Sequence, residues 1–137
     1  MTEQENKIAC HPGADIDCAM SVAYVEIGGN TGHGKYHYHY HYQPGMVLVP
    51  GHHRNVTMRY RFDQAVGFNF RIRKLISSDS QNQISNIEYD PDGRWVSFRN
   101  ANDRSTLIFF MVVVEDLQRG ETFSCDPEVG NDPQITP

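Results

Sequence analysis

The amino-acid sequence predicts an all-β protein, an antiparallel β-sandwich of about eight strands, with a small β-barrel as the alternative. Three observations predict it. Apolar and polar residues alternate with a period of two in several stretches, and Gly, Pro, Asn and Asp separate these stretches. Residues 107–114 are apolar throughout, which is typical of a central strand covered on both faces. Short strands between frequent turns favour an immunoglobulin-like sandwich.

The first half of the chain predicts three strands joined by turns. The stretch at residues 18–27 is closed by Gly28-Gly29-Asn30, and a glycine-rich loop leads from there to residues 35–42. Gln43-Pro44-Gly45 has the composition of a turn, because Pro presets φ and Gly accepts a positive φ. A short strand is expected at residues 46–50.

The second half continues the same pattern. Strict alternation at residues 55–62 and 68–73 predicts half-buried strands with one wet face. Two further strands, at residues 84–89 and 94–99, flank the hairpin turn Asp90-Pro91-Asp92-Gly93. The remaining expected strands are the apolar run at residues 107–114 and a last one at residues 122–125.

Length and composition indicate one cytoplasmic domain of 137 residues, large enough to bury a core without disulfides. The 12 Lys and Arg against 17 Asp and Glu give a net charge of −5, which argues against a general nucleic-acid binder. Residues 1–9 hold no apolar run of signal-peptide length, and no stretch is long enough to span a membrane. We expect no nucleic-acid or membrane partner, and tails at residues 1–7 and 127–137 that are extended or poorly ordered.

The three cysteines predict reduced, partly buried side chains rather than a redox centre. Cys10, Cys18 and Cys125 are odd in number and form no Cys-x-x-Cys motif. Without an export signal, thiols are the expected state.

The most unusual segment is Lys-Tyr-His-Tyr-His-Tyr-His-Tyr at residues 35–42. On a strand it places three imidazoles on one face and the tyrosines on the other. Side chains at i and i+2 lie about 6–7 Å apart at Cα, and those at i and i+4 about 13 Å apart, so only neighbouring imidazoles can share an ion. Imidazole suits Zn, Cu, Ni or Fe. The candidate metal ligands are His33, His37, His39, His41, His52 and His53.

The turn at residues 43–45 suggests which histidines combine. If it closes a tight hairpin, the register places His37 opposite His52 and His39 opposite Pro50. His37, His39 and His52 then form the best triad. Two other interpretations stay open, because an exposed histidine face needs no ligand to be stable and a row of imidazoles can also sense pH at an interface.

The same histidines resemble part of the cupin metal motif. His37-x-His39 and Pro50-Gly51-His52-His53 correspond to its two halves, which would imply a cupin-like barrel with dioxygenase or isomerase activity. No Glu follows the first pair at the cupin spacing, and this puts the activity in doubt.

The C-terminal segment carries a second resemblance. Cys125-Asp126-Pro127-Glu128 and Asn131-Asp132-Pro133 are similar to the pattern of an uncharacterised bacterial group, the DP-EP family. The resemblance implies no particular activity.

Arginines alternate along two expected strands and form a second candidate site. A hairpin loop at residues 63–67 would place Arg59 opposite Arg71 and bring like charges together. A phosphate, an acidic sugar or an acidic protein could bind between them, or neighbouring carboxylates could neutralise them. The candidate anion-binding residues are Arg59, Arg61, Arg71 and Arg73, and the candidate neutralising residues are Glu88, Glu115 and Asp116.

These patterns lead to three hypotheses for function. The first is a non-catalytic binding module whose histidine-lined strand binds a metal ion or small ligand. The second is a metal-dependent oxygenase or hydrolase, which needs an open coordination position on the ion. The third is a self-associating structural β protein, a homo-oligomer in which imidazoles tune assembly by pH.

Overall fold

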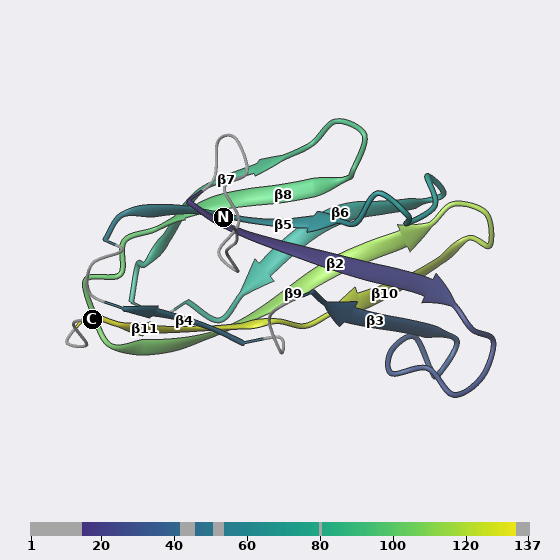
Figure 1. The fold of residues 1–137 in the computed structure, drawn as a ribbon, viewed down its shortest axis with the longest axis horizontal. Helices are drawn as coiled ribbons and strands as arrows, with labels where there is room; N and C mark the ends of the chain where they lie inside the picture. Colours follow the sequence, from purple (N-terminus) through teal and green to yellow (C-terminus); the bar gives the residue numbers. More distant parts are fainter. Residues whose placement is uncertain (1–14, 42–45, 51–53, 80, 134–137) are drawn as a thin grey trace, which may run out of the picture.

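The computed structural model describes residues 15–41, 46–50, 54–79 and 81–133, and within them it contains ten β-strands and no helix. Two five-stranded sheets pack face to face, so the predicted β-sandwich is confirmed and the closed barrel is wrong (Figure 1). The strands are β2 (Ile16–Tyr24), β3 (Tyr36–Tyr40), β4 (Met46–Pro50), β5 (Val56–Phe62), β6 (Phe70–Ser77), β7 (Ile84–Tyr89), β8 (Trp95–Asn100), β9 (Thr106–Asp116), β10 (Glu121–Cys125) and β11 (Glu128–Asp132).

The first sheet is built around β9. One edge of β9 pairs with β6, and the other pairs with β11 and then β10 along its length, while β11 also pairs with β4. Strand β11 lies within the segment that was expected to be an extended or poorly ordered tail. Its backbone hydrogen bonds join β4 to the centre of the sheet, which the proline-punctuated composition of the segment did not indicate.

The second sheet has the order β3-β2-β5-β8-β7. Strands β2 and β5 pair in parallel, as do β11 and β4, so both sheets are mixed rather than wholly antiparallel as expected. The reason is the path of the chain, which crosses between the sheets at each step from β3 to β7. A tight hairpin requires consecutive strands in one sheet, and these crossings remove that condition.

Two predicted hairpins are therefore wrong. Strand β3 pairs with β2 and β4 pairs with β11, so the turn at residues 43–45 does not join neighbouring strands. Strand β5 pairs with β2 and β8, whereas β6 pairs with β9, so Arg59 does not lie opposite Arg71. Both errors come from treating a short loop as evidence of pairing.

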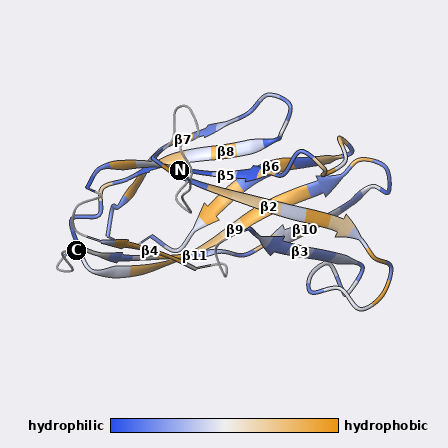
Figure 2. Ribbon diagram, viewed as in Figure 1, coloured by the Kyte–Doolittle hydropathy of each residue, from blue (hydrophilic) through white to orange (hydrophobic). Residues whose placement is uncertain are grey.

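The core lies between the sheets and is rich in aromatic and β-branched side chains. Tyr60, Phe98 and Phe110 form a group of rings with centroids 5.0–6.2 Å apart at its centre. Along β9 the apolar residues alternate between the core and the outer surface, where Leu107 and Phe109 are 45% and 51% exposed. Strand β9 is thus covered on one face only, and Figure 2 shows its apolar colouring along the sheet.

Buried amides join the two sheets near the start of β9. Asn100 of β8 and Asn131 of β11 exchange two side-chain hydrogen bonds of 2.8 Å, and Gln83 accepts a third from Asn131 at 3.2 Å. Asn102 adds bonds from its amide to the carbonyls of Val49 and Pro50 in β4. Because buried polar groups are costly when unpaired, this network specifies how the sheets meet.

Candidate functional site

The tyrosine side of β3 attaches this strand to the first sheet. The hydroxyl of Tyr36 donates to Asp116 Oδ2 at 2.7 Å, that of Tyr38 accepts from the Asp126 amide at 3.3 Å, and that of Tyr40 donates to the Cys125 carbonyl at 3.1 Å. The rings pack on the core, with Tyr36 stacked on Phe123 at 4.1 Å. The period of two then turns every histidine of the strand outward.

Asp116 is the strongest of these attachment points. Its side chain is fully buried and accepts hydrogen bonds from Tyr36, Asn69, Arg119 and the amide of Gln118. Burial alone would raise the pKa of Asp116, but the four hydrogen bonds outweigh it and hold the pKa below its usual value. The buried carboxylate is therefore charged and fully paired, and it ties β3 to the end of β9.

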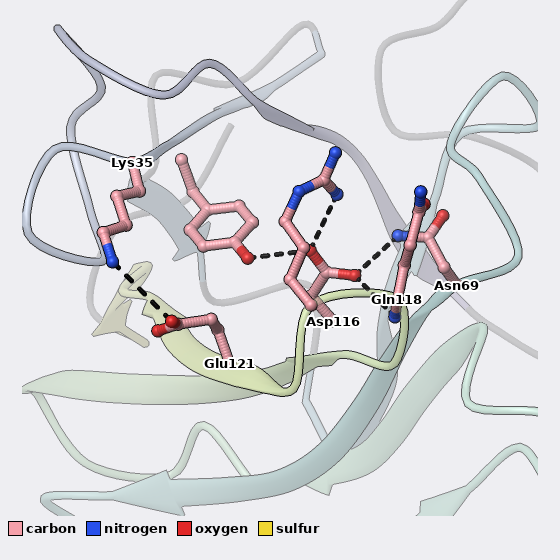
Figure 3. Close-up of polar contacts among 7 residues, drawn as sticks. Lys35, Asn69, Asp116, Gln118 and Glu121 are labelled. Atoms are coloured by element: carbon pink, nitrogen blue, oxygen red, sulfur yellow. Dashed lines mark hydrogen bonds and ion pairs between the residues drawn. The ribbon is translucent and has the colours of Figure 1, made fainter.

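Figure 3 shows this cluster with Asn69 and Gln118 close to Asp116 and a surface ion pair to one side of it. The ion pair joins Lys35, next to the first residue of β3, to Glu121 of β10 at 3.6 Å. Both partners are about half exposed, so water screens the pair and its contribution is small.

The loop before β3 covers the free edge of that strand. The Asn30 side chain accepts from the Tyr38 amide and donates to the Tyr38 carbonyl, both at 2.9 Å. Thr31 and Tyr36 exchange two backbone hydrogen bonds of 3.2 Å. These contacts take up outward backbone groups that could otherwise pair with a strand of another chain.

The histidine side of β3 lies on the outer face of the second sheet. The register places His37 beside Ala23 and His39 beside Ser21 on β2. His37 and His39 are exposed, and their ring centroids are 6.2 Å apart. His41 follows directly after β3, with its ring stacked on that of His39 at 5.1 Å.

His41 has polar neighbours of its own. Its Nε2 atom lies 2.7 Å from the Ser21 hydroxyl and 3.4 Å from Asp63 Oδ2. About a quarter of its side chain is exposed (28%), so these contacts orient the ring without burying it. Ser21 and Asp63 were not among the predicted site residues, because only the β2–β3 pairing brings them to the histidines.

The predicted metal triad is not assembled. His52 and His53 lie outside the described residues, and the hairpin register that placed His52 opposite His37 is wrong. His33 lies in the exposed loop before β3 with a φ of 59°. Within the described ranges, no group of three or more His, Cys, Asp or Glu side chains is placed to hold an ion.

The four predicted arginines divide between the sheets. Arg59 and Arg61 of β5 share the outer face of the second sheet with the histidines, whereas Arg71 and Arg73 belong to the first sheet. The expected neutralisation holds for Arg73, which pairs with Glu115 at 2.5 Å. Arg61 pairs instead with buried Asp17 at 2.7 Å, and the Arg59 guanidinium lies 4.5 Å from the Trp95 ring centroid.

Comparison with known proteins leaves the site without a precedent. No protein-family model matches the chain, and a search of curated proteins finds no match. None of the described segments forms a helix able to cross a membrane. The resemblance to the DP-EP family stays a prediction.

Proposed function

We propose that this protein is a non-catalytic cytoplasmic binding module that binds a first-row transition-metal ion on the histidine side of β3. One observation carries the proposal. The β2–β3 register and the buried tyrosines present His37, His39 and His41 in a row on an exposed, well-anchored surface. Imidazoles held on a rigid strand lose little freedom when they bind an ion.

A neighbouring pair, rather than all three rings, is the binding unit. The His37–His39 pair has the freer geometry, because Nε2 of His41 already contacts Ser21 and Asp63. Two imidazoles leave coordination positions for water or for a small ligand of the ion. Zn, Cu, Ni and Fe(II) all accept imidazole, with Zn–N distances of about 2.0–2.1 Å.

Binding is proposed rather than catalysis because His37 and His39 are exposed to water. Metal-dependent catalysis needs a dry, shaped cavity around the ion. The interpretation as a pH-tuned homo-oligomer is less favoured, because Asn30 and Thr31 occupy the backbone edge of β3 that a second copy would use.

The test is a metal titration of untagged protein purified without a nickel column. Apo protein is titrated calorimetrically with Zn, Cu, Ni and Fe(II), and the His39→Ala variant is compared with His37→Ala and His41→Ala. Both possible pairs contain His39, so only His39→Ala should abolish binding, whereas each other variant should retain one pair. His33→Ala is the matched control, because it removes an exposed imidazole outside the strand.

Either of two outcomes contradicts the proposal. One is wild-type protein that binds no ion more tightly than the His39→Ala variant does. The other is an equal loss of affinity in the His33→Ala control, which would place the ion elsewhere. Acidification should release the ion from a genuine site, because protons compete for the imidazole nitrogens.

A further inference from the structure

A polar hollow lies on the outer face of the second sheet, over β5, β7 and β8. Its volume is about 320 Å³, near the lower end of the range for ligand pockets, roughly 300–1,000 Å³. The sheet order separates it from the histidine strand by β2. Its polar lining residues are Thr57, Arg59, Asn86, Glu88, Ser97 and Arg99.

A β-bulge in β7 shapes this hollow. The β7–β8 register shifts between Ser85 and Glu88, and Asn86 within the bulge has a φ of 53°. Opposite the bulge, β8 contributes the short side chain of Ser97. Bulges re-aim side chains and are frequent beside binding sites. The local backbone is thus irregular where the polar groups converge.

Two guanidinium groups border the hollow from neighbouring strands. Arg59 pairs in register with Ser97, and Arg99 pairs with Thr57, so the two arginines are diagonal neighbours on one face. Contacts at the sides of the hollow hold both heads. The Arg99 Nη1 donates to the Asn55 carbonyl at 3.1 Å, and Arg59 lies over Trp95.

The charges of the hollow favour an anion. Arg59 and Arg99 contribute two positive charges, and Glu88 contributes the one negative charge among the lining residues. Within the described part of the chain, Arg99 forms no ion pair. A guanidinium has five N–H donors, so Arg99 keeps donors beyond the one used by Asn55. The chain as a whole has a charge of −5, which makes this local excess of positive charge distinctive.

We propose that the hollow binds a small organic anion, a phosphate or carboxylate that also carries a hydroxyl group. The oxyanion lies between the guanidiniums of Arg59 and Arg99, whose planar donor groups match its oxygens. The ligand hydroxyl donates to the Glu88 carboxylate, and the hydroxyls of Thr57 and Ser97 are available to the remaining oxygens. This site is independent of metal binding at the histidines.

The experiment is an NMR titration of ¹⁵N-labelled full-length protein at low salt with three probes. Glucose 6-phosphate carries the oxyanion and hydroxyls, inorganic phosphate carries the oxyanion alone, and glucose carries hydroxyls alone. We expect saturable shifts of the Asn86 and Ser97 amides with glucose 6-phosphate, weaker binding of phosphate and none of glucose. Low salt is needed because screening weakens charged contacts at an open surface.

Three variants assign the binding to named residues. Arg99→Gln should weaken glucose 6-phosphate binding by about tenfold or more, because it removes a charged hydrogen-bond donor. Arg73→Gln is the matched control on the other sheet and should leave binding unchanged. Glu88→Gln should strengthen binding of inorganic phosphate, because it removes a like charge, and should narrow the advantage of glucose 6-phosphate.

Three results would overturn the proposal. They are the absence of saturable shifts with every probe, equal losses in Arg99→Gln and Arg73→Gln, and weaker phosphate binding in Glu88→Gln. A thermal melt of each variant separates lost binding from lost folding, and Glu88→Gln tests the site by a gain that misfolding cannot produce.

Discussion

The two sides of β3 face different environments although their residues alternate along one five-residue strand. On one side, Tyr36, Tyr38 and Tyr40 reach the first sheet, and their hydroxyls make hydrogen bonds there. On the other side, His37 and His39 are exposed to solvent. The comparison teaches that the tyrosines determine where the strand lies, while the histidines are left for a ligand. Changes on the tyrosine side should alter stability, and changes on the histidine side should alter binding.

Alkaline pH should destabilise the buried side most. Burial raises the pKa of Cys18 to about 12 and also raises the pKa values of Cys125 and Tyr40. A raised folded pKa gives stability that is present below the unfolded pKa and lost as the pH rises above it. From about pH 9 to 11, the two thiols alone should lower the free energy of unfolding by roughly 3 kcal/mol per pH unit. Urea unfolding at pH 7.5, 9, 10 and 11 measures this.

A cysteine variant isolates the origin of the alkaline effect. Cys18→Ala should reduce the slope between pH 9 and 10 by about half, because one of the two buried thiols no longer titrates in the unfolded chain. A free energy of unfolding that stays constant from pH 7.5 to 11 would show that these side chains are not buried as described.

Asp116→Asn should cause the largest loss among single substitutions near β3, about 3 kcal/mol at pH 7, because it removes a buried charge with four hydrogen-bond donors around it. Asp126→Asn, at an exposed carboxylate, is the matched control and should change stability by less than about 0.5 kcal/mol. Urea unfolding measures both.

Acid should abolish the difference between wild type and Asp116→Asn. The folded pKa of Asp116 is lowered, so its contribution is present above the unfolded pKa of about 3.9 and is lost as the pH falls through the folded pKa. The two free energies of unfolding should therefore approach each other below about pH 4. A difference that persists unchanged at low pH would argue against a charged Asp116.

Tyr40→Phe and Tyr60→Phe should have opposite effects. Tyr40 donates to the Cys125 carbonyl, so its loss should cost about 1 kcal/mol. The Tyr60 hydroxyl is fully buried and has no hydrogen-bond partner among the described residues, so its removal should be neutral or stabilising by up to about 1 kcal/mol. Thermal unfolding of both variants gives the comparison, and equal losses would contradict it.

His39→Ala should have the smallest effect on stability, within about 0.5 kcal/mol of wild type at neutral pH, because the imidazole is exposed. The same variant is expected to lose metal binding. Chemical unfolding of the apo protein tests the stability half of this prediction. A loss above 1 kcal/mol would mean that the histidine side also positions the strand.

Local patterns predicted which residues face the core. The expected bounds of β4 and β7 agree with the structure, and in β5 the apolar residues are buried while the arginines lie outward. These features could be predicted because side chains alternate along any strand, whatever its partner. The exception is β9, whose outer side chains are exposed even though the run is apolar throughout.

Only the tertiary structure decided which strands pair. The sequence by itself determined an all-β chain, the strand positions, and the separation of tyrosines from histidines along residues 36–40. It did not determine that β3 pairs with β2, that Arg59 shares a face with the histidines, or that Asp116 meets Tyr36. Partner choice depends on apolar burial summed over both sheets and on contacts between residues far apart in the chain, and neither is encoded in the loop between two strands.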